Sequence, residues 1–316
     1  MATLRAAIER QTAHALACGA LHSIETAHTF IDDGGMRFSV RVAENLARKE
    51  AARLTPQTSA ASGSQPPRDP FLPYEADLFV ADLSPTHVAL LNKFNVIDRH
   101  LLIVTRRYEP QEALLDAADF AALIDALREV DGLAFYNGGA AAGASQSHKH
   151  LQLVPLPLVG DGPPLAPLET LLGAAQTVHG ARPIAIVPGL PFRHAFARID
   201  LARDPGPPAD PRAAHDAAQV ALGCYRALLD AAGVPALDVG GVAHQGAPYN
   251  LLVTRRWMLV VPRVVEYVEG ISVNSLGFAG SFFVRNAAHL QTLAQLGPMT
   301  ALERVSVARE DAVSRG

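Results

Sequence analysis

Residues 137–155 constrain the fold of this chain more than any other stretch. They read NGGAAAGASQSHKHLQLVP, so a run of small residues precedes hydroxyl and amide groups and then an alternating segment. Because side chains of a β-strand point alternately to its two faces, the alternation predicts a strand with His148, His150 and Gln152 on one face. Lys149 and the leucines then lie on the other face. The small residues allow backbone N–H groups to approach an anion, which indicates a phosphate-handling site.

Several interpretations of this segment are open from the residues alone. Two histidines two positions apart can chelate a metal ion, but a zinc site needs a third and usually a fourth ligand. No cysteine or glutamate pair stands nearby to supply them. A polar strand edge without chemistry is the plainest alternative. The mononucleotide and dinucleotide fingerprints GxxxxGK[ST] and GxGxxG are both absent, which excludes those two kinds of phosphate loop.

A nucleophilic histidine is the remaining interpretation. A neutral imidazole attacks phosphorus well when one ring nitrogen is unprotonated and the other donates to a backbone carbonyl. The phosphoramidate that forms is reactive enough to be transferred again. Glycine N–H groups, with Lys149 or another base, would stabilise the charge on the phosphoryl oxygens.

Composition limits the class of protein and of partner. The chain has 316 residues, enough for one large domain or two ordinary ones, and 49% of them are apolar and 18% charged. These values are typical of a globular protein. A net charge of −4 argues against a nucleic-acid polymer or an anionic membrane surface as the main partner. Any positive charge that binds phosphate must therefore be local.

Cysteine usage and the amino terminus point to a cytoplasmic protein. Cys18 and Cys224 lie in apolar helical patterns, so we interpret both as buried thiols rather than as a disulfide or a zinc site. The amino terminus MATLRAAIERQTAHAL is amphipathic and does not resemble a signal peptide. No window is long and apolar enough to span a bilayer.

Hydrophobic periodicity predicts an α+β fold with a mainly antiparallel sheet and flanking helices. Helices are expected at 3–18, 112–130, 168–177 and 213–232 and near the carboxy terminus. Strands are expected at 35–42, 78–81, 86–94, 100–105, 133–136, 192–199, 249–254, 257–262 and 281–285. The segment 56–70 reads as a polar loop rich in Pro, Ser and Gly.

A segment rich in Pro and Gly follows Pro155 and suggests a domain boundary. We predict a catalytic domain at 1–160, a connecting segment at 161–181 and a carboxy-terminal domain at 182–316. HLLIVTRR at 100–107 is echoed by NLLVTRR at 250–256, which hints at a pseudo-duplicated arrangement of two halves.

GASQSHKHLQ resembles the active-site signature of the histidine-triad superfamily, in the branch where glutamine replaces the third histidine. It is most similar to the ATP adenylyltransferase family, also called diadenosine tetraphosphate phosphorylases. Four more blocks share this resemblance: DPFLPYEADLFV, LLNKFNVIDRHLLIVTR, YNLLVTRRWMLVVPR and VNSLGFAGSFFVRN. The resemblance implies a histidine-triad-like antiparallel sheet with flanking helices.

The resemblance also implies catalytic roles. His150 corresponds to the nucleophile that takes AMP from the α-phosphate, Gln152 to the residue that binds phosphoryl oxygens, and His148 to the histidine that orients the site. A glutamine amide donates hydrogen bonds but does not titrate near neutral pH, so it activates water poorly. Inorganic phosphate arrives already anionic, and we therefore expect transfer rather than hydrolysis.

Further residues match substrate-binding positions of that family. The phosphate-facing loop is implied at Asn137, Gly143, Ser145 and Gln146, the ribose contact at Asn95, and polyphosphate contacts at Lys93 and Lys49. The second half has no HxH of its own, so we assign it to base recognition and to closing the cleft.

The expected reaction is phosphorolysis of diadenosine tetraphosphate to ADP and ATP, reversibly, through an adenylyl-histidine. Adenosine phosphosulfate as donor, giving ADP and sulfate, is the alternative within the same chemistry. A sugar-phosphate uridylyltransferase is a related rival, although that branch usually has proline where Lys149 stands. A non-catalytic nucleotide sensor is the rival from another class. Mg²⁺ could accompany the polyphosphate, and we expect neither a protein metal site nor a tightly bound cofactor.

Overall fold

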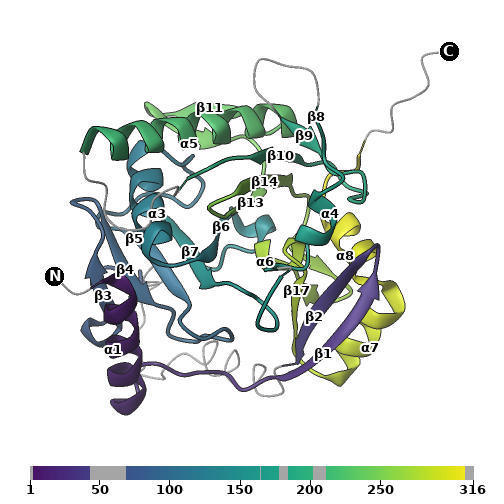
Figure 1. Cartoon of the computed structure of the whole chain (residues 1–316), viewed down its shortest axis with the longest axis horizontal. Coiled ribbons are helices and arrows are strands. Elements are labelled where there is room, and N and C mark those ends of the chain that lie inside the picture. The colour runs from purple at the N-terminus through teal and green to yellow at the C-terminus, as the bar shows by residue number, and fades with distance from the viewer. Residues whose placement is uncertain (1–2, 43–68, 164, 178–183, 202–210, 310–316) are drawn as a thin grey trace, which may run out of the picture.

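One ten-stranded sheet runs through the molecule and is shared by both halves of the chain (Figure 1). The structure is a computed structural model that describes residues 3–42, 69–163, 165–177, 184–201 and 211–309. All neighbouring strands of this sheet are antiparallel. Their order is β3 (Phe79–Asp82), β4 (His87–Leu91), β5 (Leu101–Thr105), β7 (His150–Pro155), β6 (Gly132–Gly138), β13 (Tyr249–Val253), β14 (Trp257–Pro262), β10 (Ala195–Arg198), β9 (Ala185–Ile186) and β8 (Gln176–Thr177).

The predicted pseudo-duplication appears in the topology of the sheet. The first half runs β5, α3 (Ala117–Glu129), β6, β7, and the second runs β10, α5 (Pro211–Ala232), β13, β14. In the sheet these strands are ordered β5-β7-β6 and then β13-β14-β10, so the second half mirrors the first. The echo that suggested the duplication compares β5 with β13, which are not equivalent strands. The two halves are therefore related by strand order and not by that short sequence match.

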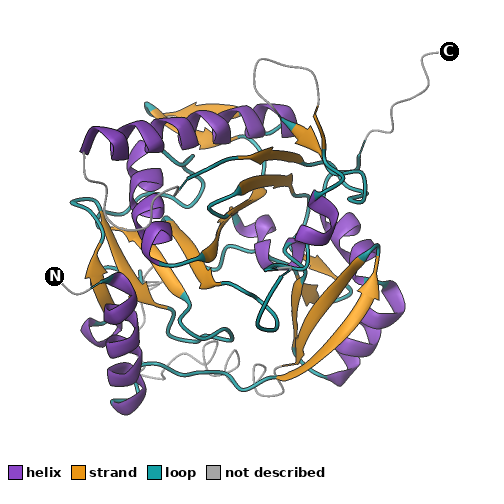
Figure 2. Cartoon of the chain, in the orientation of Figure 1, coloured by secondary structure: helices purple, strands orange, loops and turns teal. Residues whose placement is uncertain are grey.

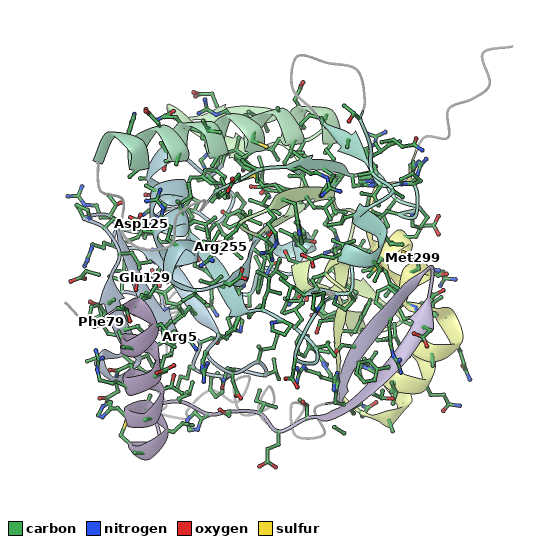
Figure 3. The ribbon with its side chains drawn as sticks, in the orientation of Figure 1. Arg5, Phe79, Asp125, Glu129, Arg255 and Met299 are labelled. Carbon is green, nitrogen blue, oxygen red and sulfur yellow. The ribbon has the colours of Figure 1, made fainter. Side chains whose placement is uncertain are left out.

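Helices cover one face of the sheet, as Figure 2 shows. α1 (Leu4–Ala17), α3 and α5 pack there on one apolar core that includes Leu151, Leu153 and Leu251. Arg5 of α1 lies near Glu129 of α3 (Figure 3), and the Glu129 carboxylate accepts a hydrogen bond from the backbone N–H at the start of α1. The described part of α5 crosses the second half of the sheet, so the two halves share this core.

The opposite face of the sheet carries two separate apolar clusters. One joins Phe135 and Leu252 to a three-stranded sheet made of β1 (Ala27–Asp33), β2 (Met36–Val42) and β17 (Ser281–Val284). The same cluster includes residues of α6 (Ser275–Phe278), α7 (Ala287–Leu296) and α8 (Pro298–Val305). The other cluster is small and contains Phe71, Leu102 and Val104. Gln152 pairs with Leu102 on one side and Phe135 on the other, so the histidine strand lies between the two clusters.

Several predicted boundaries are wrong for local reasons. The helix expected at 112–130 begins at Ala117, because Asp116 caps it by accepting hydrogen bonds from Ala118 and Asp119. The helix expected at 168–177 is only one turn, α4 (Glu169–Leu172), and is followed by β8. Six further strands were not predicted: β1, β9, β11 (Ala236–Val239), β12 (Val242–Gln245), β15 (Tyr267–Val268) and β16 (Ile271–Ser272).

Other expectations have mixed outcomes. Cys18 is exposed rather than buried, because it caps the carboxyl end of α1, and Cys224 is half-buried. No helix among the described residues is both long and apolar enough to span a membrane. The division into 1–160 and 182–316 stays a prediction. Most of the 56–70 loop, and Lys49, lie outside the described residues.

Candidate active site

His150 is the first residue of β7, and its side chain lies between the two apolar clusters. Its Nδ1 lies 2.8 Å from the carbonyl oxygen of His148. Because a carbonyl can only accept, the proton is on Nδ1 and the lone pair of the neutral ring is on Nε2. Burial lowers the pKa of His150 to about 4, although the bond to the His148 carbonyl acts in the opposite direction. The imidazole is therefore neutral near pH 7.

His148 is fixed by contacts from two distant segments. Its Nδ1 lies 2.7 Å from the Asp69 carboxylate, and its Nε2 lies 2.9 Å from both the hydroxyl and the carbonyl oxygen of Thr105. The ring of Phe71 packs against both histidines, with centroids 5.5 Å and 5.4 Å away. The segment around Asp69 thus closes one side of the histidine pair.

Gln111 holds the backbone of His150. Its side-chain oxygen accepts from the His150 N–H at 2.9 Å, and its amide nitrogen donates to the Asn137 carbonyl at 3.0 Å. Gln111 is almost fully buried. This residue therefore bridges the histidine strand and the end of β6. It was not predicted, because nothing in its own segment marks it as special.

Gln152 is bonded to a second residue that sequence reasoning missed. His100 Nε2 lies 2.9 Å from the Gln152 side-chain oxygen, and His100 Nδ1 lies 3.2 Å from the Asn92 amide nitrogen. Burial lowers the pKa of His100 to about 4, opposed by the hydrogen bond to Gln152. His100 and Asn92 stand at the two ends of the turn between β4 and β5.

The glycine-rich loop turns sharply beside these side chains. Its short 3₁₀ helix (Ala140–Ala142) lies between Gly139 and Gly143, whose φ angles are +86° and +90°. L side chains rarely adopt such angles. A Cβ on Gly143 would also come within 2.9 Å of Asn274. Glycine is required at this position for both reasons.

The second half of the chain supports this loop through Asn250 of β13. The Asn250 amide nitrogen lies 2.9 Å from the Asn137 side-chain oxygen and 2.9 Å from the Ala142 carbonyl. Ser275 donates to the same Asn137 oxygen at 2.7 Å. Arg263, fully buried, donates to the Asn250 oxygen at 2.5 Å. The buried side chain of Asn137 therefore connects the loop to Asn250 and Ser275 of the second half.

Two cavities flank Gln152. One, of about 430 Å³, is lined by His100, Gln152 and second-half residues between Glu266 and His289. The other, of about 260 Å³, is lined by Phe71, His150 and Gln152 among others. Gln152 and Ser145 line both, so the two cavities meet at this point.

Only some of the predicted substrate-binding residues line the two cavities. Asn137 and Gly143 line the larger cavity, and Gln146 and Lys93 line the smaller one, where Lys93 pairs with Glu75 at 2.5 Å. Asn95 is buried and donates to the Ile97 carbonyl at 3.1 Å, and Asn92 rather than Asn95 lines the cavities. Lys49 lies outside the described residues.

Lys149 does not face the phosphate site. It points to the helix-covered side, where its Nζ lies 2.6 Å from Asp119 and 3.0 Å from Glu109. These carboxylates outweigh burial and raise the pKa of Lys149. The idea that Lys149 stabilises phosphoryl oxygens is therefore wrong, because strand alternation sends its side chain to the opposite face.

One group of three potential metal ligands comes together among the described residues. His14, Cys18 and Asp77 are exposed, and their ligand atoms all lie within 4.8 Å of one another. None of them lines either cavity beside Gln152. Near His150, the carboxylates of Asp69 and Glu75 are bonded to His148 and Lys93. The expectation of no protein metal site stays a prediction.

Comparison with models of protein families identifies the family of this chain. The model of the Ap4A phosphorylase N-terminal domain, where Ap4A is diadenosine tetraphosphate, matches residues 1–174. The chain belongs to the Ap4A phosphorylase family. The model of the ATP adenylyltransferase C-terminal domain matches residues 188–308. Membership makes the protein an enzyme of the nucleotidyltransferase class, as predicted.

Individual relatives agree with the family. Diadenosine 5′,5‴-P1,P4-tetraphosphate phosphorylase 2 of Saccharomyces cerevisiae is 27% identical over 279 residues, which are 82% of this chain and 79% of that protein. Protein APA1 of the same yeast is 28% identical over 62% of this chain and 61% of its own length. The crystal structure of yeast Ap4A phosphorylase Apa2 superimposes with a TM-score of 0.77 at 22% identity, covering 99% of this chain and 97% of that one. The α+β fold is thus that of this family.

Lowering the pH from 7 to 4 is expected to destabilise the protein. His150 and His100 have pKa values of about 4 when folded, against 6.5 for an unfolded histidine. Between these two pH values the unfolded chain binds more protons than the folded chain. The contribution of the two histidines to the free energy of unfolding is therefore complete above pH 6.5 and is lost as the pH falls to 4. Each contributes on the order of 3 kcal/mol. Urea unfolding at several pH values measures the free energy of unfolding. In His150→Asn this free energy should depend less steeply on pH than in the wild-type protein. Equal slopes for the two proteins would contradict it.

Proposed function

We propose that this protein cleaves Ap4A with inorganic phosphate to give ATP and ADP, reversibly. The observation that carries the proposal is the geometry of His150. Its proton is on Nδ1, bonded to the His148 carbonyl at 2.8 Å, and its ring lines the smaller cavity. A neutral ring held in one tautomer has the lone pair of Nε2 available for attack on phosphorus.

The proposed reaction has two steps. Nε2 of His150 bonds to the α-phosphorus, the bond from that phosphorus to the bridging oxygen breaks, and ATP leaves. The imidazole then carries AMP, and its positive charge is stabilised by the Nδ1–H bond to the His148 carbonyl. A phosphate oxygen attacks the same phosphorus, the N–P bond breaks, and ADP is formed. His150 returns to its neutral state.

Gln152 supports phosphate rather than water as the second acceptor. Its side-chain oxygen is bonded to His100, so its amide N–H groups are available to phosphoryl oxygens. The amide has no pKa near neutrality and does not remove a proton from water. Phosphate is already anionic and needs no such base. We propose transfer, and not hydrolysis, for this reason.

The two cavities support a dinucleotide donor. A nucleoside is expected on each side of the tetraphosphate, and cavities of about 260 and 430 Å³ meet at Gln152 and Ser145. Adenosine phosphosulfate has one nucleoside and would fill only one of the two cavities. The oriented His150 counts against a sensor that only binds nucleotides. A yeast Apa2 structure was solved in complex with Ap4A, which agrees with this choice.

The other roles complete the proposal. Asn137, Gly143, Ser145 and Gln146 are proposed to shape and contact the phosphate region, with Lys93 and Lys49 as further substrate contacts. Second-half residues of the larger cavity are proposed to recognise a base and close the cleft. Mg²⁺ is proposed to arrive on the polyphosphate. The protein is proposed to act in the cytoplasm.

Incubation with phosphate and each donor tests the proposed function. We expect equal amounts of ATP and ADP from Ap4A, dependent on phosphate, and at least tenfold slower ADP formation from adenosine phosphosulfate. Chromatography of the nucleotides measures both reactions. Faster turnover of the phosphosulfate would favour the alternative donor. Tight Ap4A binding without any turnover would favour the sensor.

A further inference from the structure

The side chain of Gln152 is useful to a phosphate only in one orientation. Its amide N–H groups attract phosphoryl oxygens, whereas its carbonyl oxygen repels them. An amide can rotate by half a turn and exchange these two groups at almost no cost in shape. Something next to Gln152 must therefore select the productive orientation, and the described neighbour that bonds its oxygen is His100 at 2.9 Å.

With the Asn92 amide oriented as in the structure, the hydrogen bonds around His100 define one arrangement of protons. The Asn92 side-chain nitrogen, 3.2 Å from His100 Nδ1, can only donate, so Nδ1 accepts. The neutral ring then carries its proton on Nε2 and donates it to the Gln152 oxygen. A rotated Gln152 would set its own N–H groups against this N–H. The pair of donors would repel each other inside a buried contact.

The turn between β4 and β5 keeps this chain of hydrogen bonds in place. The backbone N–H of Asn92 donates to the carbonyl of His100 at 2.9 Å, which sets the two side chains side by side. His100 is buried, and its ring also packs near Phe135, with centroids 5.8 Å apart. His100 and Gln152 both line the larger cavity. The ring is thus held rigidly behind the amide that it orients.

We propose that His100 is a positioning residue that orients the Gln152 amide toward the phosphoryl group. Asn92 fixes the proton on His100, His100 fixes the oxygen of Gln152, and Gln152 presents its N–H groups to the substrate. This inference rests on the proposed function for its catalytic consequence. It concerns nucleotide binding as well, because the same N–H groups contact a bound phosphate.

Two variants of equal size separate orientation from packing. In His100→Gln the new amide can still donate to the Gln152 oxygen. In His100→Glu the ionised carboxylate can only accept, so it attracts the Gln152 N–H groups and turns the oxygen toward the substrate. At pH 8 we expect His100→Glu to release ATP from Ap4A about 10- to 100-fold more slowly than His100→Gln in single turnover. The ratio should shrink as the pH falls, because a protonated carboxyl donates.

The same pair in a Gln152→Ala background completes a double-mutant cycle. Any general damage from a buried carboxylate persists there, whereas the effect of orientation disappears, so the rate ratio between the two variants should be much smaller than in the presence of Gln152. AMP affinity, measured by calorimetry, provides a second readout that needs no turnover. Equal rates and equal AMP affinities for His100→Gln and His100→Glu would overturn the proposal. So would a rate ratio that Gln152→Ala leaves unchanged.

Failure of the proposed function appears differently. In that case the wild-type protein forms no ADP from Ap4A and phosphate, while the AMP-affinity cycle still reports on His100. A wild-type enzyme that phosphorolyses Ap4A, together with equal His100 variants, removes only the role of His100.

Discussion

Replacing His150 with asparagine is expected to abolish phosphorolysis, with a loss of at least about 10⁴-fold in kcat. Asparagine can keep the bond to the His148 carbonyl, which lies 2.8 Å from Nδ1 in the wild-type protein, but it has no nucleophilic nitrogen. The other residues that line the two cavities are unchanged, so Ap4A should still bind. Steady-state production of ADP and equilibrium binding of Ap4A measure the two effects separately.

His194 offers a matched control for this substitution. Its Nδ1 lies 2.8 Å from the carbonyl of Phe192, also two residues earlier, but its Nε2 already accepts from the Val187 N–H at 2.8 Å. The local geometry is that of His150 without an available nitrogen. His194→Asn should therefore retain most of the turnover. Near-normal phosphorolysis by His150→Asn would contradict the mechanism.

Replacing Arg263 with methionine is expected to lower the free energy of unfolding by about 3–5 kcal/mol. Its guanidinium is buried and donates to Asn250 and to the carbonyls of Val265, Val273 and Val305, at 2.5, 2.8, 2.9 and 3.0 Å. Burial lowers the pKa of Arg263 to about 9. Methionine would leave these buried oxygens without their donors, and that is the main cost.

The same substitution should also impair catalysis, because Asn250 holds Asn137 and the glycine-rich loop. Urea unfolding measures the loss of stability. Arg256→Met is a control at a half-exposed arginine whose ion pairs with Asp131 and Glu169 are 3.6 and 4.0 Å long. It should change stability by less than about 1 kcal/mol. Equal effects of the two substitutions would show that the Arg263 network contributes little.

The reactive strand was predictable because its pattern is local. Alternation alone separates His148, His150 and Gln152 from Lys149, and the structure places Lys149 against Asp119 on the helix-covered face. The positive φ angles at Gly139 and Gly143 explain why glycine stands at these two positions of the loop before the strand. Strand periodicity depends on neighbouring residues only, so one sequence is enough to read it.

The residues that support the site could not be predicted in this way. His100 is 52 positions from Gln152, Gln111 is 39 from His150, and Asp69 is 79 from His148. The His100 contact exists because β5 and β7 are neighbours in the sheet, and strand pairing is not visible in a single sequence. Gln111 and Asp69 reach the two histidines from segments outside the named strands. A polar residue in a turn or loop does not show which strand it will reach.

Some missed elements did carry a signal. Val239-Gly240-Gly241-Val242 is a two-residue glycine turn between short apolar runs, and it forms the β11–β12 hairpin with both glycines at positive φ. Asp116, with Asp119 three residues later, marks the start of α3. The mirrored strand order of the two halves had no reliable signal, because the duplicated strands differ in sequence.

Mass spectrometry of quenched enzyme tests the central claim most directly. Wild-type protein incubated with Ap4A and no phosphate should carry one AMP on His150 and release one ATP per chain. Adding phosphate should remove the AMP as ADP. His150→Asn should carry no AMP under the same conditions. An AMP adduct on another residue, or phosphate-dependent turnover in which rapidly quenched wild-type enzyme never carries AMP, would contradict a covalent reaction at His150.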